Sequence, residues 1–477
     1  MQRISDNPIC RSIEVIRELE DRLSKPLIQG VPIGKTLTDF LHNNLLNAQL
    51  SIRRRAALKA ALAWWRFCLL GPRHREQQPR LEAGRLLLTW LSDTPRLNDM
   101  VAPVIAELDP KQCNVIGGAP SLRSKLDPAI GYCTAEQVIA FNGKRSDWRR
   151  EYARCRSAWH SSLRQWIQDH HLPRRLFPHL AYALAVRSWQ VLAFGKFLDA
   201  FKPSIIVADA EHNNPWACLI LAARHRSIPT ATMMHGVIYS SYCYTPLLSG
   251  VALCWGREQV EQMIEQGVEP ERLLITGCQR LTRTSRVVGA EIRARLALPL
   301  NLPIVMLATG PMAREEWWKL VFAFGEAFHN HTGVSGVVRL HASERLDDYR
   351  AEKLQYPGIR FLENHQWTVE EAMAACDVVV IHNSGLGNDA LVFGRLVVLL
   401  DVLASPLSNG RTLAAKAGSP VARTAAELRQ TVDRIYADAD YRQELHRRAE
   451  EYVQRFCAAF GQVAAHNVAV EVMRRSH

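Results

Sequence analysis

Short apolar runs alternate with longer amphipathic stretches over most of this 477-residue chain. In the first half the runs that predict strands are Arg85–Leu91, Asn114–Ile116, Ser204–Ala208, Thr230–Met234, Val251–Trp255 and Leu273–Thr276. In the second half they are Ile304–Ala308, Val337–Leu340, Ile359–Leu362, Asp377–Ile381 and Leu396–Leu400. Strands that are buried on both faces are apolar throughout, so their alternation with helices predicts parallel sheets.

This pattern divides the chain into four parts. We expect a helical N-terminal extension over 1–79, a first Rossmann-like domain over 80–285, a second over 286–455 and a C-terminal helix over 456–477. The expected fold class is therefore α/β, with two Rossmann-like domains facing a cleft. Ligands of such folds bind beyond the carboxyl ends of the strands, so candidate chemistry is sought there.

Composition narrows the class of protein. Hydrophobic residues make up 48% of the chain and charged residues 22%, which excludes global disorder and fibrous repeats. The net charge of +12 favours an anionic partner. Eleven cysteines without a C-x-x-C pair argue for a reducing compartment. We expect neither a secretory leader nor a membrane-spanning helix, and hence a cytoplasmic protein.

Much of the positive charge lies in residues 51–80, which carry eight Lys or Arg and one Glu, a net +7. The same segment contains Trp64 and Trp65 within a predicted helix. A basic amphipathic helix with tryptophans suits the inner surface of a cell membrane. A helix packed on its own protein with a solvated basic face, or a nucleic-acid contact, would also explain this segment.

The strand ends of the first half carry candidate catalytic groups. His235 follows a predicted strand and precedes a glycine, so its imidazole can act as a general base or be a hydrogen-bonded strand end. Asp209 and Glu211 follow the run that ends at Ala208; they bind substrate or cap the next helix. Tyr239, one of three tyrosines after His235, can stack on a sugar or belong to an apolar loop.

The second half carries candidate anion-binding groups. Strand alternation places Arg339 and His341 on one face, where a guanidinium and an imidazole suit a diphosphate; a solvated strand end is the alternative. Thr309 and Gly310 form a strand-to-helix turn suited to phosphate or simply a turn.

The loop after the strand that ends at Ile381 has small residues whose backbone N–H groups can approach a phosphate: Asn383, Ser384 and Gly385. Asp389 then suits ribose hydroxyls. An ordinary helix N-cap explains this loop equally well, since it has neither a G-x-G-x-x-G pattern nor a P-loop.

At these residues the chain resembles the GT-B glycosyltransferases of bacterial surface-polysaccharide synthesis. The relatives are capsule sialyl and Kdo transferases, teichoic acid glycerophosphotransferases and non-hydrolysing UDP-sugar 2-epimerases. The stretches that carry the resemblance are 202–237, 254–277, 339–344 and 382–400. The chain departs from the pattern at Ala342, Asp389 and Leu396, where Pro, Glu and Pro are usual.

The resemblance implies a metal-independent transfer of sugar from a nucleotide-activated donor to a cell-surface polysaccharide or glycolipid. The second domain would hold the donor and the first the acceptor. His235 would deprotonate the acceptor hydroxyl, while Arg339 and His341 would neutralise the leaving phosphate. The implied site residues are His235 and Asp209 for catalysis; Thr309, Gly310, Arg339, His341, Asn383, Ser384, Gly385 and Asp389 for the donor; and Glu211 and Tyr239 for the acceptor.

No metal and no cofactor besides the donor is expected. Asp438-Ala439-Asp440 matches the D-x-D motif of metal-dependent sugar transferases, but it lies among helical residues, where capping explains it better. Three alternatives stay open: a nucleotide-sugar epimerase, a basic nucleic-acid-binding protein and a catalytically inactive glycan-binding protein.

Overall fold

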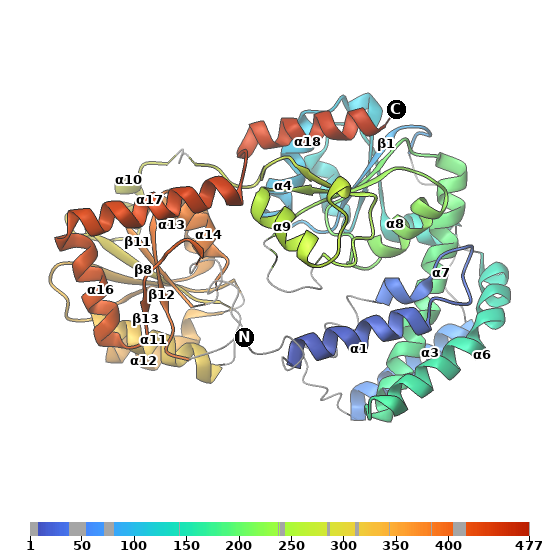
Figure 1. The fold of residues 1–477 in the computed structure, drawn as a ribbon, viewed down its shortest axis with the longest axis horizontal. Helices are drawn as coiled ribbons and strands as arrows, with labels where there is room; N and C mark the ends of the chain where they lie inside the picture. Colours follow the sequence, from blue (N-terminus) through green and yellow to red (C-terminus); the bar gives the residue numbers. More distant parts are fainter. Residues whose placement is uncertain are drawn as a thin grey trace. The chain divides into compact units, whose positions relative to one another are not determined.

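The chain was analysed as a computed structural model that describes residues 8–37, 54–70, 81–142, 144–236, 238, 244–283, 287–310, 314–342, 344–382, 384–403 and 416–476. It divides into two compact units. Unit 1 comprises Met1–Trp255, Gln259–Gln279 and Gln462–His477, and unit 2 comprises Gly256–Glu258 and Arg280–Gly461. Each unit is built around one parallel sheet (Figure 1).

The described strands of unit 1 form a seven-stranded sheet in the order β3-β2-β1-β4-β5-β6-β7. They are β1 (Leu86–Trp90), β2 (Cys113–Gly117), β3 (Gly131–Thr134), β4 (Ile206–Ala208), β5 (Thr230–Met233), β6 (Val251–Cys254) and β7 (Leu273–Ile275). Every neighbouring pair is parallel. The strand order reverses between β1 and β4, which places the topological switch point of this sheet there.

Helices cover both faces of this sheet. They include α4 (Pro95–Ala106), α5 (Ala135–Asn142), α7 (Phe177–Phe201), α8 (Trp216–His225) and α18 (Gly461–Arg475). Side chains of β1 alternate between the faces: Leu86, Leu88 and Trp90 pack with α4 and α18, and Leu87 packs with α7 and α8. This two-sided burial is why the strands are apolar throughout.

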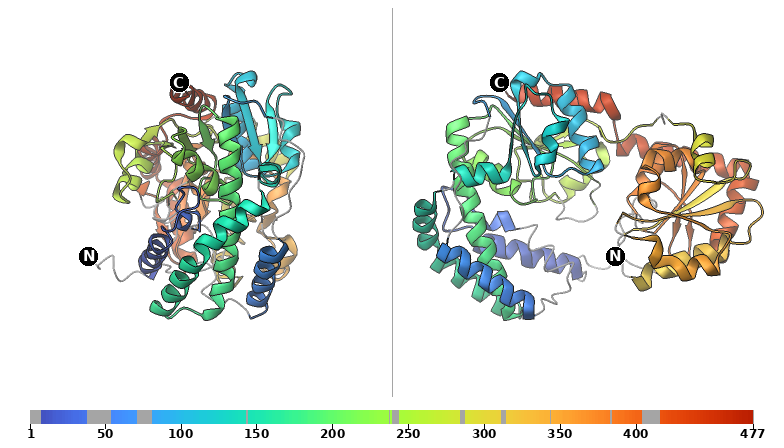
Figure 2. Two further views of the ribbon diagram at one scale, coloured as in Figure 1. Left: turned by 90° about the vertical axis from the view of Figure 1, so that its right-hand side faces the viewer. Right: turned by 180° about the vertical axis from the view of Figure 1, so that it is seen from behind.

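A helical part precedes and extends this unit, as expected for the N-terminal extension. It consists of α1 (Pro8–Arg22), α3 (Arg54–Leu70) and α6 (Arg145–Asp169). Helices α3 and α6 pack with the long helix α7, and α1 packs with α6. Figure 2 shows α3 lying beside α7, away from the strands. Arg154 of α6 donates to the backbone oxygen of Leu27, and Trp166 donates to that of Val15, so the N-terminal segment is tied to α6.

The described strands of unit 2 form a six-stranded parallel sheet in the order β10-β9-β8-β11-β12-β13. They are β8 (Ile304–Ala308), β9 (Ser335–Arg339), β10 (Arg360–Leu362), β11 (Val378–Ile381), β12 (Leu396–Leu400) and β13 (Val421–Ala422). Counted from β8, this is the 3-2-1-4-5-6 order of Rossmann folds. The helices around this sheet include α11 (Arg314–Phe328), α13 (Val369–Ala375), α14 (Leu386–Val392), α16 (Ala425–Ala437) and α17 (Ala439–Phe456).

The predicted strands correspond to strands of the structure, and two short strands were not predicted. Gly131–Thr134 forms β3 and Val421–Ala422 forms β13, although neither segment is an apolar run. The last helix of the chain, α18, begins at Gly461 and packs in the core of unit 1, through Ala465 and Val468.

Candidate functional site

Three strand ends lie side by side at the carboxyl edge of the unit 2 sheet. β8 is paired on one side with β9 and on the other with β11, so Ala308 neighbours both Arg339 and Ile381. The switch point of this sheet is between β8 and β11. An ideal Cβ on Gly310 would lie 4.0 Å from the Cα of Ser384, which shows how closely the two turns approach. The structure therefore brings the predicted donor residues Thr309, Gly310, Arg339, His341, Ser384, Gly385 and Asp389 to one edge.

The Glu344 carboxylate ties two of these turns together. Its Oε2 accepts hydrogen bonds from Oγ1 of Thr309 at 2.5 Å and from the backbone N–H of His341 at 2.9 Å. Oγ1 of Thr309 accepts from the same N–H at 2.8 Å. The Thr309 hydroxyl is thus used within the protein, and it holds the turn that carries the partly exposed His341 ring.

Arg339 is a buried cation at this edge, with only 8% of its surface exposed. Its Nη2 donates to Oδ1 of Asn364 at 2.6 Å, while its buried Nε has no hydrogen-bond partner among the described residues. Burial lowers the pKa of the guanidinium, and the charge of Asp389 opposes that shift. A buried N–H without an acceptor is costly, so a ligand or water that accepts a hydrogen bond from it would remove this cost.

Asp389 is paired with a second arginine that the sequence did not single out. Its Oδ1 accepts from Nη1 of Arg280 at 2.8 Å, and the two side chains are 8% and 17% exposed. The charge of Asp389 also acts on Arg339, where it favours the charged guanidinium and so opposes the lowering of the pKa by burial. The expected contact of Asp389 with ribose would have to compete with Arg280.

The loop after β11 is described on both sides of Asn383, which itself lies outside the described residues. The His382 ring is buried, and its Nδ1 is 2.8 Å from the backbone oxygen of Leu400. Ser384 is partly exposed and Gly385 is exposed at the start of α14. His382 therefore anchors the loop, and the two small residues after it form its accessible part.

In unit 1, Asp209 braces the switch point. Its Oδ1 accepts from Oγ1 of Thr89 at 2.5 Å and its Oδ2 from the backbone N–H of Leu91 at 2.6 Å, which joins the ends of β4 and β1. The side chain is fully buried; burial raises the pKa of its carboxyl, and these hydrogen bonds oppose the rise. The structure thus gives Asp209 a bracing place rather than the substrate-facing place expected for a catalytic group.

Glu211 is also committed to the backbone. Its two carboxylate oxygens accept from the N–H groups of Leu248 and Ser249, both at 2.8 Å, which fixes the loop before β6. Its Oε1 lies 3.5 Å from Nε2 of His212. Both buried ring nitrogens of His212 lack a hydrogen-bond partner among the described residues. Sequence reasoning left His212 out of the site, although its place just after the β4 strand end was a usable signal.

His235 lies on the turn that follows β5, the neighbour of β4. Its backbone oxygen accepts from Nε and Nη2 of Arg96 at 3.0 and 2.7 Å, and its ring centroid is 5.3 Å from that of Tyr244. An ideal Cβ on Gly236 would lie 2.3 Å from Nη2 of Arg96, so a larger residue there would displace this guanidinium group. His235 is partly exposed and is held from both sides. Tyr239 lies outside the described residues.

The third carboxylate at this edge, Asp93, is more exposed than Asp209 and Glu211. It pairs with Nζ of Lys125 at 2.5 Å and accepts from Asn98 at 2.9 Å, and these contacts lower the pKa of its carboxyl to about 2. It therefore stays ionised at neutral pH. In unit 1 the structure places His235, His212, Asp209 and Glu211 on adjacent strand ends, β4 and β5.

No group of three or more His, Cys, Asp or Glu side chains that could hold a metal ion occurs among the described residues. In the D-x-D segment, Asp438 is the N-cap of α17 and accepts from the backbone N–H of Tyr441 at 2.9 Å, as capping predicts.

Comparisons with known proteins bear on the fold. No protein-family model and no curated protein sequence matches the chain. Among solved structures, the chain is similar to Anabaena HepE in complex with UDP, with a TM-score of 0.50 at 13% identity over 82% of this chain and 99% of that chain. It is also similar to a UDP-GlcNAc 2-epimerase from Neisseria meningitidis bound to UDP-GlcNAc (TM-score 0.47, 12% identity, 82% and 99% coverage). A third is a glycosyltransferase from Rickettsia africae (TM-score 0.49, 11% identity, 82% and 99% coverage).

At such identities the likeness concerns the fold alone, and the HepE structure supports it best. The class is α/β, with two parallel-sheet units and an N-terminal helical part. The particular fold is the GT-B type, so the predicted fold class is confirmed.

Proposed function

We propose that the chain is a metal-independent glycosyltransferase, which transfers a sugar from a nucleotide-activated donor to a polysaccharide or glycolipid acceptor of the cell surface. One observation carries this proposal. At the carboxyl edge of unit 1 three described carboxylates, Asp93, Asp209 and Glu211, are committed to internal partners, and the His235 imidazole is a partly exposed titratable group beside them. Such an edge suits deprotonation of a hydroxyl.

The edge of unit 2 supplies the donor side of the proposal. Glycosyl transfer leaves negative charge on the departing phosphate, and fixed cations aimed at it stabilise the transition state more than the ground state. Arg339, His341 and the backbone at Ser384 and Gly385 would meet that phosphate. HepE was solved with UDP, which supports a nucleoside diphosphate as the leaving group.

On the acceptor side, His235 would take the proton of the attacking hydroxyl. Imidazole titrates near neutral pH, as a general base must. The turn held by Arg96 fixes the backbone of His235, and the Tyr244 ring packs against the imidazole. His212 would line the same edge on the adjacent strand end.

A nucleotide-sugar epimerase is the main alternative, because structures of that class share the fold. Acid–base chemistry at a sugar carbon by carboxylates needs groups that are free to exchange protons. Asp209 and Glu211 bind backbone N–H groups and Asp93 is held ionised by Lys125, so these carboxylates favour the transferase. The nucleic-acid-binding and inactive glycan-binding alternatives gain no support from this edge.

The donor is tested by thermal-shift measurements with CMP, UDP, GDP, TDP and CDP, because a ligand that binds only the folded state raises the melting temperature. We expect one nucleotide to stabilise the protein. Calorimetry with that nucleotide should show at least ~tenfold weaker binding for Arg339→Ala, because a charge-assisted phosphate contact is lost. Arg339→Lys keeps the charge and should fall between. Arg360→Ala, an exposed arginine on β10, is the matched control.

The reaction is tested by incubating the protein with UDP-N-acetylglucosamine without an acceptor and then with cell-surface glycans. An epimerised sugar in the first sample would establish the alternative, and transfer only in the second supports the proposal. His235→Ala should lower turnover ~100-fold or more with an unchanged melting temperature. His225→Ala, at the far end of α8, should turn over like the wild type.

The place of action is part of the proposal. No disulfide joins the nine cysteines whose side chains the structure describes, which suits the cytoplasm, where nucleotide-sugars are made. An acceptor anchored in a membrane would bring the enzyme to the inner membrane surface.

A further inference from the structure

Helix α3 presents an apolar stripe to solvent. Leu58, Leu62 and Trp65 are 62%, 56% and 63% exposed. They stand at i, i+4 and i+7, so they share one face of the helix. Three large apolar side chains in a row differ from the single exposed leucines of ordinary surfaces, and such patches mark binding surfaces.

The opposite face of α3 is already used for packing. The Phe67 ring makes edge-on contacts with Trp148 of α6 at 5.0 Å and with Tyr182 of α7 at 6.1 Å between ring centroids. Phe67 and Cys68 pack against the core of unit 1. The helix is thus anchored through one face, and the stripe is not needed to hold it in place.

Positive charge flanks the stripe. Lys59 and Arg66 each follow a stripe residue by one position and are exposed. Within the described part of the chain, no carboxylate lies in ion-pair distance of either. The surrounding segment, residues 51–80, has a net charge of +7.

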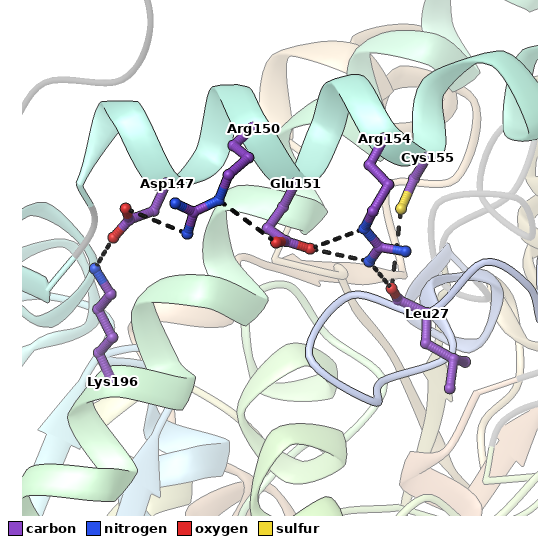
Figure 3. A network of polar contacts seen from close by, with 7 residues as sticks. All are labelled: Leu27, Asp147, Arg150, Glu151, Arg154, Cys155 and Lys196. Atoms are coloured by element: carbon purple, nitrogen blue, oxygen red, sulfur yellow. Dashed lines mark hydrogen bonds and ion pairs between the residues drawn. The ribbon is translucent and has the colours of Figure 1, made fainter.

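On the neighbouring helix α6, by contrast, carboxylates neutralise the basic side chains. Arg150 pairs with Asp147 and Glu151, Arg154 pairs with Glu151 and donates to the Leu27 oxygen, and Lys196 pairs with Asp147 (Figure 3). That face binds the protein's own N-terminal segment. The charge on α3 stands apart from this network and is available to an external anion.

We propose that α3 binds the surface of an anionic lipid bilayer, lying in the membrane plane. The stripe would enter the boundary between headgroups and acyl chains, with Trp65 at the level that tryptophan prefers, and Lys59 and Arg66 would meet lipid phosphates. No helix in the described part of the chain is long and apolar enough to cross a membrane. A surface helix is consistent with that finding. The inference stands on α3 alone and not on sugar transfer.

The test is sedimentation of the full chain with vesicles of phosphatidylcholine, with and without phosphatidylglycerol. We expect binding only to vesicles with phosphatidylglycerol and weaker binding as salt is raised. Leu62→Gln/Trp65→Gln should bind at least ~tenfold more weakly, because buried apolar area drives insertion. Lys59→Gln/Arg66→Gln should lose most of the salt dependence. Leu354→Gln, which changes an 84% exposed leucine of unit 2, is the matched control.

Three outcomes would overturn the proposal. The first is equal vesicle binding by the wild type and the Leu62→Gln/Trp65→Gln variant. The second is a wild-type dimer that this variant converts to monomer in sedimentation velocity, which makes a second copy the occupant. The third is no vesicle binding by a wild type that melts higher than the variant, which indicates that the stripe is covered by the chain itself. Nucleotide binding, measured in parallel, should be the same in all variants, so it reports on the proposed function separately.

Discussion

The charge cluster behind the unit 2 edge gives the sharpest prediction. The Asp389 carboxylate pairs with the guanidinium group of Arg280 at 2.8 Å, and its charge also acts on Arg339. Asp389→Asn keeps the size and one hydrogen-bond acceptor but removes the charge. Two mostly buried cations then lack their counter-charge, and removing one partner of a buried pair costs about 3–5 kcal/mol. Because Arg280 is partly exposed and solvent screens its charge, we expect a loss below this range, about 2 kcal/mol.

The assay should report on unit 2 alone, because a two-unit protein need not unfold in one step. Hydrogen exchange measured by mass spectrometry meets this need, because it gives separate exchange rates for the peptides that cover β11 and α14 of unit 2. A loss of about 2 kcal/mol corresponds to exchange that is ~30-fold faster when reclosing is fast and exchange therefore reports the opening equilibrium. Peptides from the sheet of unit 1 should exchange as in the wild type.

Two further variants make the result interpretable. Asp433→Asn removes an exposed carboxylate of the same unit, which pairs with His331 at 2.8 Å, and should change exchange less than twofold. The double variant Arg280→Gln/Asp389→Asn should cost less than the sum of the single changes, because the two residues interact. Exchange within twofold of the wild type in Asp389→Asn would refute the view that this carboxylate balances two arginines.

Three other changes test the two edges and the helical part. Asp209→Asn should lower the free energy of unfolding by about 2 kcal/mol in urea titrations, because one amide group cannot accept both hydrogen bonds as the carboxylate does. Glu344→Gln should raise the Kd of the donor nucleotide ~threefold or more in calorimetry by loosening the turn of His341, with little loss of stability. Burial lowers the pKa of His160 to about 4, whereas the unfolded chain titrates near 6.5, so falling pH protonates the unfolded state first. Unfolding free energy should therefore drop by about 1–2 kcal/mol between pH 7 and pH 5, and His160→Gln should remove this part of the pH dependence.

Much of the fold could be predicted because parallel strands buried on both faces must be apolar at every position. Ile304–Ala308 and Leu396–Leu400 were predicted to the residue. β3 escaped prediction because Gly131–Thr134 contains a glycine and a tyrosine and pairs with β2 alone, at the edge of its sheet. Edge strands need only part of the apolar pattern, so periodicity cannot find them reliably.

The site was harder to predict than the fold because its polar partners are far apart in sequence. Strand ends could be located from the runs before them, which is how His235, Arg339 and Ser384 were found. Arg280 and Asp389 are 109 residues apart, and nothing in either segment indicates their pairing. Asp209 shows the opposite difficulty, because a carboxylate just after a strand can either join two strand ends or contact substrate. The burial of its side chain and its hydrogen bond from the backbone N–H of Leu91 indicate that it joins β4 to β1.

The carboxyl edges of the two sheets carry different polar groups, and the burial of those groups explains the difference. In unit 1 the protein uses its carboxylates to satisfy backbone N–H groups and a hydroxyl at the switch point, so Asp209 could act as a base only by breaking the β1–β4 brace in each turnover. The proposed base is instead the imidazole of His235. Arg96 holds this residue through its backbone oxygen, and the Tyr244 ring packs against the imidazole. At the carboxyl edge of unit 2, one of the buried groups with spare hydrogen-bonding capacity is a cation, Arg339. The proposed transfer would use the imidazole at one edge for the acceptor hydroxyl and the partly unsatisfied cation at the other for the leaving phosphate, and an experiment can disprove either role without the other.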